Sequence, residues 1–237
     1  MKAFLQAALE ALIPPVCAAC GDDVPTWSQV ACRACQETFD PFRGPHCVVC
    51  GAPFIGEGSS GERPCGGCAA QPPPFRRARA FGAYGAALEE LIIAFKFHGR
   101  RDLAAPLAGL LCLALDEEYI DPDLVAPVPL SRRRLRARGY DQAWLLARAT
   151  GRILGVDARP RALRRVRHTP PQSSLTSSAR RQNVRGAFEP GPDGVVGLNV
   201  LLIDDVMTTG ATVSECASAL TRAGAARVQV ATVARSV

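Results

Sequence analysis

The sequence predicts an α/β protein in which a parallel sheet flanked by helices follows a small cysteine-rich domain. Short apolar runs alternate with segments of helical spacing, the pattern of buried parallel strands joined by helices. Eight of the ten cysteines fall within the first 70 residues, in four C-x-x-C pairs. The proline-rich joint Gln71–Pro74 separates the two patterns, so we expect domains at residues 1–70 and 75–237.

The composition is that of a globular protein with an uneven charge distribution. The chain has 237 residues, 48% of them hydrophobic and 21% charged, enough for one medium α/β domain and a small appendage. The net charge is +6, but residues 131–190 alone carry 15 Arg against three acidic residues, a local balance of +12. This segregation indicates a polyanionic ligand, either pyrophosphate or nucleic acid, with a solvated arginine-rich surface as the alternative.

The amino terminus has no strong targeting signal. Met1–Val16 is predicted to form a short amphipathic helix ended by Pro14 and Pro15, and Gln6 and Glu10 make it a poor signal peptide. No apolar run approaches the roughly 18 residues typical of a membrane span. These features predict a cytoplasmic protein whose cysteines bind metal rather than form disulfides.

The cysteine pairs have the spacing of zinc ligands. Two C-x-x-C turns supply the four thiolates that Zn²⁺ accepts in a tetrahedron, so the region predicts a double zinc ribbon whose folding depends on metal. An interleaved pairing is the alternative to sequential sites. Redox chemistry usually needs a single such motif near a βαβ unit, and His46 is expected to be a bystander. Sequential pairing gives the ligand sets Cys17, Cys20, Cys32, Cys35 and Cys47, Cys50, Cys65, Cys68.

The second domain begins with a predicted strand and two helices. Arg79–Tyr84 has the character of a strand, and Ala86–Phe97 has the spacing of an amphipathic helix closed by Gly99. Asp102 is the expected N-cap of a further helix that continues to Glu118.

An arginine cluster follows the next predicted strand, Leu124–Val128. Five arginines lie within residues 132–138, where a pyrophosphate loop is expected. At this strand end, guanidinium groups would face a ligand crevice and grip a diphosphate with forked hydrogen bonds. A nonspecific nucleic-acid patch is the alternative. Asp141 is the predicted N-cap of a helix over Gln142–Leu154, which Gly155 should end.

A second arginine-rich stretch, residues 159–187, is expected to be a functional loop. It lacks hydrophobic periodicity between Arg167 and Gly186, and long loops in compact domains are usually functional. Such a loop would close over a phosphorylated ligand and exclude water, with a disordered surface excursion as the alternative. The residues predicted to act on pyrophosphate in the two basic segments are Arg133, Arg138, Arg180, Asn183 and Arg185.

The strongest ligand signal follows the apolar strand Asn199–Ile203. Small, hydroxyl-rich residues come next, and their N–H groups can converge on a phosphate before the predicted helix Val213–Ala223. The two acids after the strand suit ribose hydroxyls. An ordinary acidic turn is the alternative, while a P-loop is excluded because no G-x-x-x-x-G-K-[ST] occurs. The predicted binding residues are Asp204, Asp205, Val206, Met207, Thr208, Thr209, Gly210, Ala211 and Thr212.

The segment Leu201–Thr212 resembles the 5-phosphoribosyl pyrophosphate (PRPP) loop of the type I phosphoribosyltransferases. The chain as a whole resembles the ComF family of competence proteins, with Tyr140-Asp141 standing where Phe-Asn is expected in many relatives. Besides the cysteine pairs and the PRPP loop, the likeness is carried by Phe95–Gly99, Val128–Leu130, Arg138–Ala143, Arg167–Gln172 and Arg181–Phe188.

The resemblance implies a type I phosphoribosyltransferase fold with structural zinc, PRPP as the ligand and Mg²⁺ as its companion ion. It also implies a role in natural transformation, with incoming single-stranded DNA and DNA-uptake proteins as partners on the cytoplasmic side. Two functions remain open: a PRPP-binding accessory protein of DNA uptake, and an active phosphoribosyltransferase on an unidentified base or amine. In the second, Asp204 and Asp205 would be catalytic.

Overall fold

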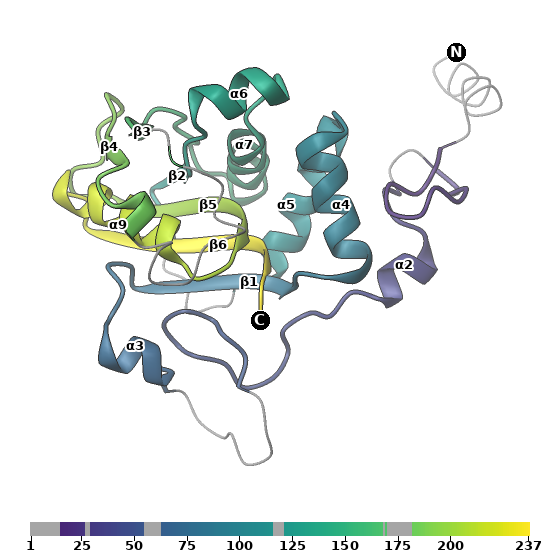
Figure 1. Ribbon diagram of the computed structural model, residues 1–237, viewed down its shortest axis with the longest axis horizontal. Helices are drawn as coiled ribbons and strands as arrows, with labels where there is room; N and C mark the ends of the chain where they lie inside the picture. The colour runs from purple at the N-terminus through teal and green to yellow at the C-terminus, as the bar shows by residue number, and fades with distance from the viewer. Residues whose placement is uncertain (1–14, 27–28, 55–62, 116–120, 168, 170–181) are drawn as a thin grey trace.

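A four-stranded parallel sheet forms the centre of the computed structural model (Figure 1). The model describes residues 15–26, 29–54, 63–115, 121–167, 169 and 182–237, so the predicted helix at Met1–Val16 lies almost wholly outside the described residues. The strand order is β1-β6-β5-β2, and every pairing is parallel, which confirms the predicted fold class. The strands are β1 (Arg77–Ala83), β2 (Leu124–Pro127), β5 (Asn199–Met207) and β6 (Arg227–Arg235).

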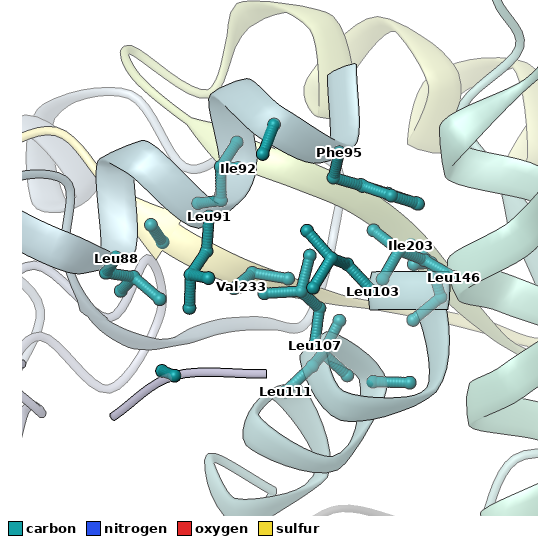
Figure 2. Close-up of a cluster of buried hydrophobic side chains, with 14 of the residues drawn as sticks. Leu88, Leu91, Ile92, Phe95, Leu103, Leu107, Leu111, Leu146, Ile203 and Val233 are labelled. Atoms are coloured by element: carbon teal, nitrogen blue, oxygen red, sulfur yellow. The ribbon is translucent and has the colours of Figure 1, made fainter. Parts of the chain in front are cut away.

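Helices cover the sheet through two separate apolar clusters. On one face the helices are α4 (Ala86–Phe97), α5 (Ala104–Leu113) and α7 (Gln142–Leu154). The other cluster contains α9 (Ala211–Arg222). Figure 2 shows Leu91 of α4 and Leu107 of α5 meeting Val233 of the sheet. In the described part of the chain, no helix has the length and apolar character needed to cross a bilayer.

Local signals set the ends of α7. The Asp141 side chain accepts a hydrogen bond from Trp144 N at 3.1 Å, and Gly155 ends the helix in the left-handed region at φ +70°. Both predictions are confirmed, because an N-cap carboxylate satisfies an N–H group that the helix itself leaves unpaired. The Tyr140 hydroxyl donates to the Phe95 carbonyl, which ties the start of α7 to the end of α4.

The prediction for Asp102 was wrong. Its carboxylate pairs with the Arg100 guanidinium at 2.8 Å, so it is not available to cap a helix. A short 3-10 turn, η1 (Arg101–Leu103), precedes α5, and Leu103 is the N-cap residue. The helix also ends at Leu113, earlier than predicted.

Strand β5 is longer than its apolar run. It continues through both acids to Met207, because β6 pairs with it along that length: Asp204 lies opposite Thr232, and Met207 lies opposite Arg235. The hydrogen bonds between parallel strands join backbone groups, so the strand can continue beyond its run of apolar residues. Both acids therefore belong to strand β5 rather than to the ordinary acidic turn that was the alternative.

The first arginine cluster forms a short helix, α6 (Arg132–Arg138), rather than the predicted loop. Ser131 Oγ caps it by accepting from Arg134 N at 3.3 Å, and Gly139 ends it at φ +79°. A Ser N-cap and a left-handed Gly give even seven residues a helical register.

Two short strands that the sequence did not predict pair with each other, one within the second arginine-rich stretch and one directly after it. Strands β3 (Leu163–Arg165) and β4 (Phe188–Pro190) pair antiparallel and pack on α9. Three-residue strands are too short to show a periodicity. Most of the predicted loop between them, residues 168 and 170–181, lies outside the described residues.

The cysteine region contains two short helices, α2 (Arg33–Glu37) and α3 (Gly66–Ala70). Helix α2 lies beside α4, and the later part of the region packs along the edge strand β1 (Figure 1). Ala78 N donates to Val49 O at 2.7 Å, which joins the second ribbon to β1. Gly51 lies so close that a Cβ there would be 2.5 Å from the Ala78 carbonyl oxygen. The ribbon thus covers backbone groups that an exposed edge would leave unpaired.

Candidate functional site

Two groups of four cysteines lie where the sequence predicted zinc sites. Within each group the sulfur atoms are within 4.8 Å of one another, and the grouping is sequential, which overturns the interleaved alternative. His46 belongs to neither group and contacts Gly44 O through Nδ1 at 2.9 Å, so it is a bystander as predicted. The groups are Cys17, Cys20, Cys32, Cys35 and Cys47, Cys50, Cys65, Cys68.

Backbone hydrogen bonds prepare both groups for a cation. Cys17 Sγ accepts from Cys32 N at 3.3 Å, and Cys47 Sγ accepts from Cys65 N at 3.2 Å. Burial opposes ionisation, but these N–H groups and their neighbours lower the pKa of Cys17 and of Cys47 to about 6. Four clustered sulfurs with N–H···S contacts fit structural Zn²⁺.

A cavity of about 700 Å³ opens at the carboxyl end of β5. Its wall combines the end of β5, the start of α9, the end of α4, and parts of α6 and α7. Ligands of open α/β sheets bind at such strand ends. Of the residues predicted to bind a ribose phosphate, the wall contains Asp204, Asp205, Val206, Met207, Thr208, Gly210, Ala211 and Thr212.

The loop before α9 lies at the amino end of that helix. Gly210 adopts φ +75° at the N-cap position and has no side chain to cap the helix, so the positive end of the helix dipole faces the loop. Thr209 is not part of the cavity wall, and its hydroxyl accepts from Ala211 N at 3.4 Å.

The two acids of β5 have different environments. Asp205 is 5% exposed; its Oδ1 lies 2.7 Å from Lys96 Nζ, and its Oδ2 accepts from Gln142 Nε2 at 3.1 Å. Asp204 Oδ1 accepts from Asp205 N at 2.9 Å. Successive side chains of a strand point to opposite faces, so Asp205 turns to α4 and α7 while Asp204 turns to α9. The prediction treated the acids as an equivalent pair, and the structure separates them.

Asp204 titrates near neutral pH. Burial raises its pKa to about 8, the neighbouring charge of Asp205 adds to the increase, and Lys96 opposes it. At pH 7 the carboxyl group is therefore mostly protonated, and it can donate a hydrogen bond as well as accept one.

Three arginines, Arg134, Arg138 and Arg165, complete the cavity wall. The Arg138 guanidinium lies 4.8 Å from the centroid of the Phe97 ring, and its Nη1 is buried with no partner among the described residues. Burial lowers the pKa of both Arg138 and Arg165. Guanidinium groups held out of water around one cavity favour an anionic ligand.

The other described residues that were predicted to act on pyrophosphate lie outside the cavity wall. Arg133 is exposed on α6, outside the cavity wall. Asn183 and Arg185 are also outside it, and their carbonyl oxygens accept from Arg167 at 3.0 and 2.5 Å. Arg180 lies outside the described residues.

Sequence reasoning assigned no role to Lys96, Phe97 or Gln142. All three lie in segments that carried the family resemblance, Phe95–Gly99 and Arg138–Ala143, and Lys96 is one of two lysines in the chain, so a weak signal existed. Their approach to Asp205 and the cavity depends on how α4 and α7 pack on β5, which no local pattern encodes.

The fold and the cavity define a phosphoribosyltransferase-like protein with an amino-terminal double zinc ribbon. Family models agree: the double zinc ribbon domain matches residues 8–70, and the phosphoribosyl transferase domain matches residues 156–236. The chain is 37% identical over 189 residues to the DNA utilization protein YhgH of Salmonella typhimurium, covering 78% of this chain and 81% of the relative.

A second relative is Competence protein F of Haemophilus influenzae, 34% identical over 212 residues, which cover 86% of this chain and 90% of the relative. The chain belongs to the ComF family of competence proteins. Among solved structures, the glutamine PRPP amidotransferase of B. subtilis matches with 20% identity over 58% of this chain and 30% of that chain. Its TM-score of 0.37 is too low to show a shared fold by itself.

Proposed function

We propose that the protein binds PRPP, or a related 5-phosphoribosyl ligand, in the cavity at the end of β5 and handles single-stranded DNA during DNA uptake. The observation that carries the ligand is the cavity itself, which unites the loop before α9, a carboxyl pair and three guanidinium groups. The role in DNA uptake is supported by relatives named Competence protein F and DNA utilization protein. We place this activity in the cytoplasm, in contact with DNA-uptake proteins.

Each part of the ligand has a matching group in the wall. The 5-phosphate would occupy the loop at the start of α9, and the diphosphate would face Arg134, Arg138 and Arg165. Asp204 would accept or donate a hydrogen bond at the ribose hydroxyls. Because Asp205 is already paired with Lys96, the diphosphate and the ionised form of Asp204 would hold the accompanying Mg²⁺, which neutralises diphosphate charge and favours loss of the Asp204 proton.

Calorimetry with Mg-PRPP on the zinc-loaded protein tests ligand binding. Arg138→Ala and Asp204→Ala should each weaken binding by about tenfold or more, since each removes a polar group from the cavity wall. Arg133→Ala is the matched control, because this arginine belongs to the same helix but lies outside the wall. Absence of heat with the wild-type protein, or equal losses in all three variants, would contradict the proposal.

Catalysis by Asp204 and Asp205 is the second candidate function, favoured by the pKa of about 8 at Asp204. A group that gains and loses protons near neutral pH suits acid–base chemistry beside a bound sugar. In that reaction the bond from ribose C1 to the pyrophosphate oxygen breaks, and a bond from C1 to the acceptor nitrogen forms. The acceptor proton passes to ionised Asp204 or to water.

Pyrophosphate release measured over a panel of bases and amines tests this second function. Release with one acceptor, abolished in Asp204→Asn, would support transfer. Tight PRPP binding without release for any acceptor would limit the protein to ligand binding.

A further inference from the structure

We propose that the same cavity receives the 5′-phosphorylated end of single-stranded DNA, with the terminal phosphate in the loop before α9 and the terminal base stacked beside Phe97. This inference rests on the proposed function, because it places a phosphate in the same loop. The second proposed occupant of the cavity is a terminal deoxyribonucleotide, and the rest of its strand continues outside the cavity.

The carboxyl groups of Asp204 and Asp205 would select only weakly for a ribose over a deoxyribose. Both oxygens of Asp205 are occupied, by Lys96 Nζ and Gln142 Nε2, and one oxygen of Asp204 accepts from the backbone. A site that selects ribose needs free acceptors for two hydroxyls. Because Lys96 and Gln142 already engage Asp205, fewer acceptor positions remain for ribose hydroxyls, so a sugar without a 2′-hydroxyl loses little.

The carboxyl pair also repels a phosphodiester less than two free acids would. Lys96 Nζ lies 2.7 Å from Asp205 Oδ1 and neutralises that carboxylate. Gln142 is 4% exposed, lines the cavity and carries an Oε1 atom with no partner among the described residues, an acceptor for a base or sugar donor.

Phe97 supplies a stacking surface at the cavity. It lines the wall yet is 66% exposed, and the Arg138 guanidinium lies 4.8 Å from the centroid of its ring. An aromatic ring and a guanidinium plane are the groups on which nucleobases stack, without regard to sequence.

The outer face of α6 gives a strand a path away from the cavity. Arg132, Arg133 and Arg136 are exposed there, and the helix contains no acidic residue. A PRPP molecule bound in the cavity would not reach these side chains, whereas the phosphates of a bound strand would. A cavity of about 700 Å³ is the size of a small-molecule pocket, so it fits one nucleotide at a strand end rather than a passing duplex.

The test compares two oligothymidylates that differ only at the 5′ end, one phosphorylated and one with a hydroxyl. Each carries a dye at its 3′ end, and fluorescence anisotropy reports binding to the zinc-loaded full chain. We expect the phosphorylated strand to bind about tenfold more tightly. Ribose 5-phosphate should remove that advantage by competing for the loop, and Phe97→Ala should reduce it. The triple variant Arg132→Ala, Arg133→Ala, Arg136→Ala should weaken both strands equally and flatten the salt dependence.

Equal affinity for the two strands, or an advantage that ribose 5-phosphate does not remove, would overturn the inference. Calorimetry with ribose 5-phosphate alone separates this failure from that of the proposed function. Heat of binding together with equal strand affinities would retain the phosphoribosyl site and reject end recognition. No heat would reject both.

Discussion

Lys96 and Asp205 form a buried ion pair that joins the end of α4 to β5. The Nζ and Oδ1 atoms are 2.7 Å apart, and the two side chains are 18% and 7% exposed. Gln142 of α7 donates to the other carboxylate oxygen, so two helices of one face converge on a single acid at the cavity. This acid therefore has a structural role as well as a place in the cavity wall.

Lys96→Met should destabilise the protein by about 3–5 kcal/mol, because it leaves the Asp205 carboxylate buried without its counter-charge. The free energy of unfolding from urea titrations measures the loss. Arg33→Met is the control: Arg33 and Glu37 also lie 2.8 Å apart, but their side chains are 91% and 65% exposed, so no measurable change is expected. Similar stabilities for the two variants would show that burial of the Lys96 pair has no energetic consequence.

Asp204→Asn should change how stability depends on pH. The pKa of Asp204 is raised from 3.8 to about 8 by burial, so the folded protein holds a proton there that the unfolded chain releases. Its free energy of unfolding should fall as pH rises from about 4 to 8, by at most about 1.4 kcal/mol per unit for this group. Asparagine does not titrate and should lose this contribution.

Urea titrations between pH 6 and 8.5 check this expectation while the zinc sites stay intact. The stability of Asp204→Asn relative to wild type should increase steadily with pH and level off above pH 8. A difference that is constant across the range would place the pKa of Asp204 in the folded protein below pH 6.

Gly51→Ala should loosen the second zinc ribbon from the sheet. Its φ of +68° disfavours a side chain, and the new Cβ would lie 2.5 Å from the Ala78 carbonyl oxygen. Gly21→Ala is a matched control, because Gly21 follows the first ribbon's pair at φ +83° with nothing within 4 Å of its Cβ. Hydrogen exchange at Ala78 N–H should accelerate in Gly51→Ala and stay at the wild-type rate in Gly21→Ala. Equal exchange in both variants would remove the role assigned to this contact.

Asp141→Ala should destabilise the protein by about 0.5–2 kcal/mol through loss of the cap on Trp144 N, whereas Asp141→Asn should retain most of the stability. Burial also raises the pKa of Asp141, so the neutral amide avoids a desolvation penalty that the carboxylate bears. Thermal unfolding of the two variants compares them directly. A loss in the asparagine variant as large as in the alanine variant would show that the charge, rather than the cap, is what matters.

Signals confined to a few residues were predictable. The C-x-x-C spacing identified both groups of cysteines. The Asp141 cap and Gly155 predicted both ends of α7 at the correct residues. The loop before α9 was recognisable as part of a cavity wall, because small residues after a buried parallel strand come at the edge of the sheet where ligands bind. Asp102 shows the limit of such signals, because the Arg100 guanidinium pairs with the carboxylate that was expected to cap a helix.

The sequence by itself thus determined the fold class, the ends of α7 and the zinc chemistry, because each is encoded in patterns of residues close together in the chain. Only the tertiary structure decided that Asp205 is held by Lys96 and Gln142 while burial raises the pKa of Asp204 beside it. Alternation along β5 sends the two carboxyl groups to opposite faces, and what each meets there depends on helices packed from distant parts of the chain. Burial and charge act through space, so two adjacent and identical acids acquire different chemistry.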